Sequence, residues 1–469
     1  MQNIKAQPVT TYPPRVIQFG EGNFMRGFFN WQLAQMNKQG LFQGSAIVVQ
    51  PIPQGLKALL DQQDDRYTVI LEGLVDGVPI QKAELISTIH AVIDPYQQWQ
   101  DFLALAENDA LDIIVSNTTE AGIRFDPADT ISDTTTPSSF PAKLTALLYR
   151  RFQLKKSGFT IIPCELIDRN GDQLKEAVQA YAKLWALPAA FSDWLDTDNQ
   201  FCCSLVDRIV PGYPREQAAE YETLIGYQDR LIVTAEPFML WVIEGSEIEA
   251  KLPLAAAGLN VIVTDDMTPY RERKVHLLNG PHTAVVSLGC LAGLETVEDV
   301  MNDPDFTLYL DRLFQNELIP MLDLPESQLN AYAEEIKERF KNPYVHHQLQ
   351  SIALNSVSKF TARLLPILTR FYQTQQQIPL RITASLAGLL HRYLTVPFTD
   401  DPLVSAIFAE AQALAPSEQL TFLLGDERLW QRDLRYLTDE IQGMMMILSQ
   451  EGPRALLHYV EQQEAVSPL

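Results

Sequence analysis

Residues 15–38 read RVIQFGEGNFMRGFFNWQLAQMNK, and residues 45–50 read SAIVVQ. The RVIQF and SAIVVQ runs are apolar and rich in β-branched residues, which is typical of strands buried on both faces of a parallel sheet. Between them, apolar residues recur at helical spacing over Asn23–Lys38, namely Met25, Phe29, Leu33 and Met36. Strand, glycine turn, helix and strand in this order predict the βαβ unit that opens a dinucleotide-binding fold.

The chain has 469 residues, which is too long for one ordinary core and favours two domains. Further strands are expected in the first half, at Thr68–Leu71, Leu111–Ser116, Phe159–Pro163 and Leu259–Thr264. After about residue 265 helical patterns dominate, for example over Phe306–Leu322, Ser327–Phe340, Val345–Thr374, Ser385–Tyr393 and Pro402–Leu414. We therefore expect an α/β domain over residues 1–265 and a mostly α-helical domain over residues 266–469.

The formal net charge is −23 and the pI is near 4.7. An acidic surface repels phosphate backbones and anionic lipids, so partners such as nucleic acid and membranes are disfavoured. It also repels an anionic substrate, so any anion site requires a local group of Lys, Arg or backbone N–H donors. No apolar stretch approaches the length of about 20 residues needed to span a bilayer.

The four cysteines are Cys164, Cys202, Cys203 and Cys290. None forms a CxxC pair, so the sequence indicates neither a zinc site nor a disulfide framework. Buried reduced thiols in a cytoplasmic protein are expected, and no secretory signal pattern occurs in the first thirty residues.

The glycine turn after the first strand reads FGEGNFMR over residues 19–26. Gly20 permits a tight turn, and Gly22 allows the backbone to approach a pyrophosphate. Met25 stands where GxGxxG has its third glycine, and Gln50 stands where an acidic residue would hold the ribose. A GxG turn occurs in many α/β proteins, and these residues do not decide between NAD and NADP.

A second group of polar residues lies in the stretch YRERKVHLLNGPHT, residues 270–283. Hydride transfer between a carbinol and a ketone needs a proton-transfer group and a donor for the oxyanion, and Lys274 and Asn279 have the right chemistry. His282 lies one helical turn beyond Asn279, and positive charge nearby disfavours the ammonium form of the lysine. The alternative is an amphipathic helix with solvated basic residues and a capping asparagine.

Pro281 interrupts this stretch, because its ring would clash with the carbonyl of Leu277 in a continuous helix. The sequence predicts either a kink or a new helix with Pro281 in its first turn. Either arrangement changes how Lys274 and His282 face each other.

Several segments, in this order, are similar to those of the long-chain mannitol dehydrogenase family. They are FGEGNFMR (19–26), SNTTEAGI (116–123), PCELIDRNGD (163–172), LVDRIVPGYP (205–214), K-x4-N-x2-H (274–282) and R-F-x-N-P (339–343). The resemblance implies a Rossmann-type N-terminal domain, a helical C-terminal domain and an active site in the cleft between them. It also implies an NAD-dependent, zinc-independent oxidoreductase that acts on CH–OH groups, and the wording of the segments favours members that reduce tagaturonate to altronate.

The resemblance also assigns roles to residues. It implies Lys274 as the general acid/base, Asn279 with Asn170 as the oxyanion site, and His282 as the group that orients the substrate. Asp207 and Lys359 match substrate-site positions. The cofactor turn is matched by Gly20, Gly22, Phe24 and Arg26, and the segment beside the nicotinamide by Thr119, Glu120 and Gly122.

Two departures bear on the substrate. Polyol-using members carry an arginine where this chain has Ser351, and a glutamate where it has Arg271. Both changes are compatible with a substrate that carries its own carboxylate. Fructuronate or a ketose as substrate, a scaffold protein without catalysis, and a zinc enzyme are the alternatives. The sequence does not reveal the oligomeric state.

Overall fold

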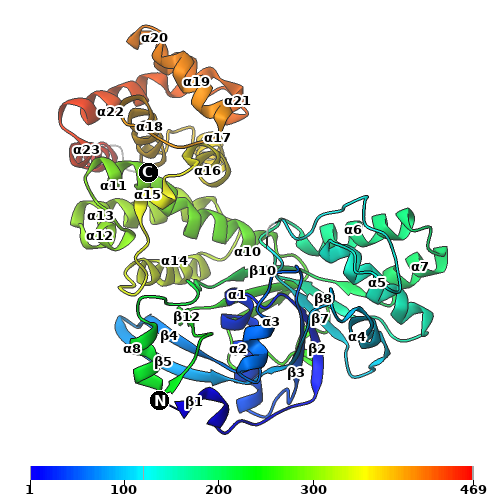
Figure 1. Cartoon of the computed structure of the whole chain (residues 1–469). Helices are drawn as coiled ribbons and strands as arrows, with labels where there is room; N and C mark the ends of the chain where they lie inside the picture. Colours follow the sequence, from blue (N-terminus) through cyan, green and yellow to red (C-terminus); the bar gives the residue numbers. More distant parts are fainter. Residues whose placement is uncertain (1, 120, 467–469) are drawn as a thin grey trace. The chain divides into compact units, whose positions relative to one another are not determined.

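The computed structural model describes residues 2–119 and 121–466. The chain forms two compact units (Figure 1). The first takes in the chain up to Gly73 and Pro79–Met267, and the second takes in Leu74–Val78 and the chain from Thr268 onward. The chain thus passes into the helical unit after Met267, where the sequence places the join after residue 265.

A six-stranded parallel sheet forms the centre of the first unit. Its strands, in spatial order, are β6 (Ile89–Ile93), β3 (Ser45–Val49), β2 (Pro14–Phe19), β7 (Ile113–Ser116), β8 (Thr160–Pro163) and β9 (Gln200–Phe201). Numbered along the chain, these strands have the order 3-2-1-4-5-6 of dinucleotide-binding folds. The predicted Rossmann-type fold of the first domain is therefore confirmed.

Both faces of this sheet are buried, as the β-branched runs predict. Along β2 and its neighbours, alternate residues join two separate cores, so that Val16 belongs to one and Ile17 to the other. Helix α2 (Phe29–Lys38) covers the first face, and α4 (Trp99–Ala104), α5 (Phe140–Gln153), α6 (Asn170–Leu184) and α7 (Ala189–Thr197) cover the second. A strand inside such a sheet cannot alternate polar and apolar residues, because both sets of side chains leave water.

Two of the predicted strands lie outside the main sheet. Strand β4 (Tyr67–Val75) lies between β12 (Val233–Ala235) and β5 (Val78–Ile86), and β14 (Val261–Thr264) pairs with β13 (Leu240–Glu244), which also pairs with β10 (Cys203–Asp207). The short apolar runs indicated strands correctly, but they carry no information about pairing partners. The smaller elements of this unit are β1 (Gln2–Asn3), α3 (Lys57–Gln62), α8 (Ala218–Ile225), β11 (Tyr227–Gln228) and α9 (Ile248–Lys251), with short 3-10 turns at Ile4–Ala6 and Leu105–Glu107.

The predicted helix over Asn23–Lys38 is divided at Phe28 into α1 (Asn23–Gly27) and α2. A Cβ at Gly27 would lie 3.0 Å from side-chain carbons of Val210 and Val233. A side chain at Gly27 would therefore require both valines to shift, and the chain bends immediately afterwards, at Phe28.

From Thr268 onward, the described residues of the second unit form helices and the segments that connect them (Figure 1). Its α-helices are α10 (Thr268–Arg273), α11 (Gly280–Leu291), α12 (Val297–Asn302), α13 (Pro304–Arg312), α14 (Glu326–Phe340), α15 (Leu349–Ile352), α16 (Ser356–Arg363), α17 (Leu365–Gln375), α18 (Leu380–Thr395), α19 (Pro402–Gln412), α20 (Pro416–Gly425), α21 (Glu427–Trp430), α22 (Thr438–Gln450) and α23 (Pro453–Val466). Two π-helical segments, Lys274–Asn279 and Leu313–Leu318, and 3-10 turns at Ile319–Met321 and Arg435–Leu437 complete it. Helix α11 packs against α15, α16 and α18.

The helical pattern over Val345–Thr374 corresponds to three helices, α15, α16 and α17, instead of one. Asn355 adopts a left-handed conformation before α16, and Pro366 lies in the first turn of α17, where its missing N–H costs no hydrogen bond. Within the described part of the chain, no helix has the length and apolar character that a bilayer crossing requires.

The backbone conformations of Gly20 and Gly22 lead to a testable prediction about stability. Gly20 has a φ of +107°, and a Cβ there would lie 2.5 Å from the carbonyl oxygen of Asn117. Gly22 has a φ of −63°, and nothing lies within 4 Å of its added Cβ. Gly20→Ala should therefore lower the free energy of unfolding by about 1–3 kcal/mol, whereas Gly22→Ala should change it by less than about 1 kcal/mol.

Urea denaturation of the two variants, compared with the wild type, checks this prediction. Equal shifts of the denaturation midpoint in both variants would contradict the close approach at Gly20.

Candidate functional site

The glycine turn after β2 lies against the segment that follows β7. The N–H of Asn117 donates to the carbonyl of Phe19 at 3.0 Å, and the space that a Cβ of Gly20 would need is occupied by the Asn117 carbonyl. Strand order reverses between β2 and β7, and at such a switch point the loops at the carboxyl ends of the strands leave a crevice for a dinucleotide. The two segments that the sequence assigned to the cofactor are thus neighbours.

Gly22 and Phe24 have the surroundings that a cofactor turn needs. Gly22 is the N-cap residue before α1 and has open space where a side chain would be, so its backbone is accessible from that side. The half-buried ring of Phe24 stacks on Phe28, with ring centroids 4.9 Å apart. These residues fit a turn that a pyrophosphate approaches closely.

Arg26, also assigned to the cofactor by the sequence, is buried and bonded inside the unit. Its guanidinium donates to the carbonyl of Glu21 at 3.1 Å, to the carbonyl of Leu231 at 2.6 Å and to Oδ1 of Asn23 at 2.6 Å. Burial lowers the pKa of this guanidinium. Arg26 therefore supports the glycine turn from inside the unit. Its position in the motif could not reveal this role.

The segment after β7 is ordered by a carboxylate that the sequence analysis missed. Glu165 accepts hydrogen bonds from the Ser116 hydroxyl at 3.0 Å and from the N–H and hydroxyl of Thr118 at 2.9 and 3.0 Å. Burial raises the pKa of Glu165. Its place in the PCELID segment, directly after a buried strand, was the only signal in the sequence.

Beyond Thr118, the exposed Thr119 has a φ of +80°, and its carbonyl accepts from the N–H of Gly122 at 3.0 Å in a tight turn. A Cβ at Gly122 would lie 1.8 Å from the Thr118 hydroxyl oxygen. Glu120 lies outside the described residues. Thr119 lies three residues after the carboxyl end of β7 at Ser116.

Asn170 has partners that differ from the predicted oxyanion role. Its Nδ2 donates to the carbonyls of Pro163, Glu165 and Ser204 at 2.9–3.0 Å, and its Oδ1 accepts from the N–H groups of Gly171 and Ser204 at 2.9 Å. The side chain is fully buried. Because an amide has two hydrogens, none remains for a substrate oxygen. This geometry supports a structural role for Asn170, which joins β8 to β10.

Asp207, a predicted substrate contact, is the last residue of β10 and is buried. Its register partner on β13 is Leu240. Its place at the end of a strand suits a functional carboxylate, and its contact with substrate stays a prediction.

In the second unit, Lys274 and Asn279 are the two ends of a π-helical segment between α10 and α11. The N–H of Gly280 donates to the carbonyl of Val275, five residues earlier, and Pro281 lies in the first turn of α11. The wider turn accommodates the proline ring, so the structure resolves the kink that the sequence left open. Single π-turns of this kind occur frequently at functional sites.

The π-turn changes which side chains share a face. In an α-helix, residues five apart are separated by roughly 140° around the axis; a turn that closes on the fifth residue brings Lys274 and Asn279 nearer to one face. Both residues are half-buried, and the Asn279 carbonyl accepts from the Thr283 hydroxyl at 3.0 Å. His282 follows three residues later on the same helix.

His282 packs against Phe340 and His347, with ring centroids at 4.1 and 5.0 Å. The pKa of His282 lies well below its usual range, because burial disfavours the cation and His347 and Arg363 add positive charge nearby. His282 is therefore a neutral imidazole at pH 7, which can orient a substrate hydroxyl without carrying a charge.

Lys359, on α16, donates from Nζ to the carbonyl of Ile352 at 2.8 Å. Its pKa is lowered by burial and by the charge of Arg363. The sequence analysis missed His347 and Arg363 in this neighbourhood, although Arg363 stands four residues after Lys359, at helical spacing. Lys359 and Arg363 together make a positively charged cluster beside the helix that carries Asn279 and His282.

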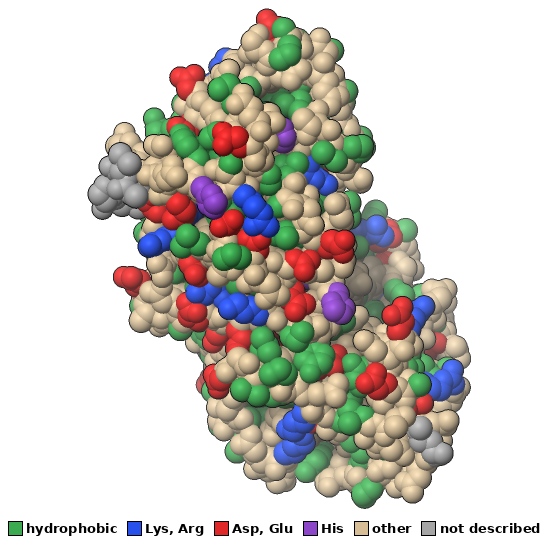
Figure 2. All heavy atoms as spheres, turned by 90° about the vertical axis from the view of Figure 1, so that its left-hand side faces the viewer, with side chains coloured by type: hydrophobic (Ala, Val, Ile, Leu, Met, Phe, Trp, Pro, Cys, Tyr) green, Lys and Arg blue, Asp and Glu red, His purple; other side chains and the backbone are tan. Residues whose placement is uncertain are grey.

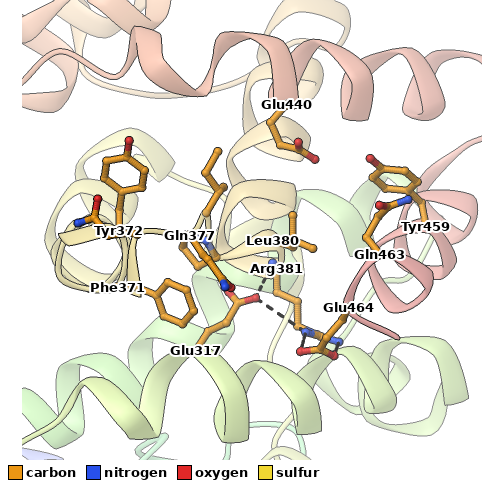
Figure 3. A pocket seen from close by; sticks show the side chains of 13 residues that line it. Glu317, Phe371, Tyr372, Gln377, Leu380, Arg381, Glu440, Tyr459, Gln463 and Glu464 are labelled. Atoms are coloured by element: carbon orange, nitrogen blue, oxygen red, sulfur yellow. Dashed lines mark hydrogen bonds and ion pairs between the residues drawn. The ribbon is translucent and has the colours of Figure 1, made fainter. Parts of the chain in front are cut away.

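A cavity of about 540 Å³ elsewhere in the second unit contains none of the predicted site residues (Figure 3). Arg381 lines this cavity, and its guanidinium is engaged with carboxylates. Glu317 accepts from the N–H groups of Arg381 and Ile382 at 2.8 and 2.9 Å, and burial raises the pKa of Glu317 to about 7. Arg381 pairs with Glu461 and with Glu464. The cavity thus offers no cation to an anionic substrate.

On the face drawn in Figure 2, acidic and basic side chains are interspersed, and hydrophobic side chains stand singly or in small groups. The described residues contain no group of three or more His, Cys, Asp or Glu side chains that could hold a metal ion. The features that favour a chemical function are therefore the glycine turn in the first unit and the Lys274–His282 helix in the second.

Known proteins match the chain over nearly its full length. Curated relatives named altronate oxidoreductase include that of Bacillus subtilis (strain 168), which is 42% identical over 463 residues, with 96% of each chain covered. That of Yersinia pestis is 40% identical over 469 residues, with 96% of this chain and 97% of the relative covered.

Two solved structures share the fold. D-sorbitol dehydrogenase has a TM-score of 0.83 at 21% identity, with 97% of this chain and 96% of that chain covered. Pseudomonas fluorescens mannitol 2-dehydrogenase, solved with NAD and D-mannitol, has a TM-score of 0.72 at 22% identity, with 98% of this chain and 96% of that chain covered.

Two family models cover most of the chain. The mannitol dehydrogenase Rossmann domain matches residues 14–255, and the mannitol dehydrogenase C-terminal domain matches residues 266–446. The resemblance seen in the sequence motifs is confirmed: the chain belongs to the mannitol dehydrogenase family.

Proposed function

We propose that this protein catalyses the reversible reduction of D-tagaturonate to D-altronate with NADH, without a metal ion. The observation that carries the proposal is the similarity to altronate oxidoreductases over nearly the full length of the chain. The prediction of an oxidoreductase acting on CH–OH groups is confirmed by the family and these relatives. A cytoplasmic location belongs to the same proposal, since all four cysteines are free thiols.

The first unit has the features that an NAD site needs. Gly20 leaves no room for a side chain, Gly22 presents open backbone, and the turn at Thr119 lies at the same edge of the sheet. Bound NADH supplies the hydride that reduces the substrate carbonyl. The residues proposed to hold it are Gly20, Gly22, Phe24, Thr119 and Gly122, with Arg26 supporting the turn from inside.

In the second unit, Lys274 is proposed to deliver the proton to the carbonyl oxygen during reduction and to remove it during oxidation. The Asn279 amide donates to the same oxygen as negative charge develops on it. Neutral His282 orients the substrate through a hydroxyl, and Lys359 and Asp207 are proposed as further substrate contacts. A lysine and an amide donor supply the polarisation that a metal ion gives in other dehydrogenases.

The cofactor assignment predicts the effect of filling the space at Gly22. Gly22→Val should weaken NADH binding at least about tenfold, because the side chain would occupy the space through which the pyrophosphate approaches. Gly443→Val, at another glycine with nothing within 4 Å of its added Cβ, is the matched control and should leave binding unchanged. Fluorescence titration with NADH measures both variants, and wild-type affinity in Gly22→Val would show that the turn is only structural.

The mechanism predicts the effect of removing the amine of Lys274. Lys274→Met keeps the length and apolar packing of the side chain, so the fold and cofactor binding should persist, while turnover should fall by about a hundred- to ten-thousand-fold. Single-turnover measurements avoid masking by product release. Lys337→Met, which removes a lysine paired with Asp311 and Glu334, is the control for charge. Near-native single-turnover rates in Lys274→Met would exclude it as the proton-transfer group.

The proposed independence from metal ions is tested by removing any bound metal from the protein. Activity should survive prolonged dialysis against EDTA, and elemental analysis should find no stoichiometric zinc, because Lys274 and Asn279 polarise the carbonyl. Loss of activity on dialysis, with recovery on addition of zinc alone, would contradict this part of the proposal.

A further inference from the structure

Arg363 and Lys359 lie four residues apart on α16, so their side chains share one face of the helix. Both are half-buried. Two like charges at this spacing destabilise a helix unless something else binds both of them. Their placement therefore calls for a binding partner with negative charge.

The position of Arg363 is fixed by the helix that carries the proposed catalytic residues. Its Nη1 donates to the hydroxyl of Thr283 at 3.2 Å, and that hydroxyl donates to the carbonyl of Asn279 at 3.0 Å. The carbonyl of Arg363 is also bonded to Nδ1 of His276 at 2.7 Å. The guanidinium is thus held beside Asn279 and His282, and only one of its five N–H donors is used in these contacts.

Neither cation has an ion-pair partner among the residues that the structure describes. Other arginines in the chain have one: Arg169 pairs with Glu244, Arg381 with Glu464, and Arg454 with Asp303. Asp400 acts on Lys359 electrostatically, but its carboxylate accepts from the Tyr393 hydroxyl at 2.7 Å and from the N–H of Val357 at 3.2 Å. A partly buried cation without a counter-ion is unfavourable, and it is most readily explained by an anionic ligand.

The surroundings are positively charged in a protein whose net charge is −23. The pKa of Arg363 is lowered by burial, that of Lys359 by burial and Arg363, and that of His347 by burial and Lys359. All these shifts oppose positive charge, so a bound anion would relieve them. This is the local cationic group that the overall acidity requires of an anion site.

We propose that Arg363, together with Lys359, binds the carboxylate of the sugar-acid substrate and sets the preference for a sugar acid over a neutral ketose. The inference rests on the proposed function. The planar guanidinium matches a carboxylate with two parallel hydrogen bonds, which the ammonium of a lysine cannot do. Arg363 is a specificity residue in this scheme, and Lys274 and Asn279 act at the reacting carbonyl.

The test compares two substrates that differ only at the anionic group. D-tagatose has a CH₂OH group where D-tagaturonate has its carboxylate. Arg363→Met should lower kcat/KM for tagaturonate by about ten- to a hundredfold, because it removes hydrogen bonds to a charged group, and most of the loss should be in KM. The loss with tagatose should be at least several-fold smaller, so that the ratio of the two kcat/KM values falls.

Three variants control for charge, geometry and folding. Arg370→Met removes a positive charge from a neighbouring helix, where Arg370 pairs with Asp323, and should leave the substrate ratio unchanged. Arg363→Lys keeps the positive charge but loses the paired N–H donors of the guanidinium, so the ratio of the two kcat/KM values should be intermediate. Arg363→Gln retains a donor for Thr283; it should fold even if Arg363→Met does not, and it should show the same loss of preference as expected for Arg363→Met.

The outcomes separate this inference from the proposed function. Wild-type protein that does not reduce tagaturonate would overturn the proposed function and this inference with it. Wild-type protein that prefers tagaturonate, with equal losses for both substrates in Arg363→Met and Arg363→Gln, would overturn the inference alone. A rise in the KM for NADH that accounts for the loss would do the same, because it would place Arg363 at the cofactor.

Discussion

Burial of one parallel sheet on both faces is the constraint on which the first unit depends. Such strands are apolar at most positions, and a polar residue among them needs a buried partner, as Gln18 has in Asn30 and in the carbonyl of Gly20. Because the strands run in the same direction, their carboxyl ends meet at one edge. Polar groups needed for binding can then stand only where the strands end. The turn after β2 and the segment after β7 meet at this edge, and the missing side chain of Gly20 lets them touch. Glu165 and Asn170 use their polar atoms to hold the neighbouring strand ends in place.

In the second unit, the ring of Pro281 is the constraint that shapes the backbone beside the proposed catalytic residues. Pro281 has no N–H to donate to a helical hydrogen bond, and the chain accommodates it by widening one turn over Lys274–Asn279. The widened turn changes the direction of the side chains at its two ends. The hydroxyl of Thr283 then links this helix to Arg363 on α16, so a local backbone irregularity is tied to residues more than eighty positions away.

The electrostatics of the chain work at two scales. The large negative net charge acts over long distances and is screened by salt, whereas the Lys359 and Arg363 cluster acts over a few ångströms in a partly buried setting. A local site can therefore attract an anion even though the protein as a whole repels it. Neutral His282 adds no charge to this cluster, because burial and the neighbouring cations hold it in its uncharged form.

The sequence by itself determined the parts of this protein that depend on neighbours along the chain. The continuous apolar runs of β2 and β3, the need for glycine at residue 20, and the disruption at Pro281 are local, and each was predictable from a few adjacent residues. Only the tertiary structure decided which strands β4 and β14 pair with, and that Arg26 and Asn170 bond inside the fold. It also brought Arg363 and His347 to His282. The physical reason is that a polar side chain can form hydrogen bonds with many different partners. Packing between segments that are distant in the sequence decides which of these partners it meets.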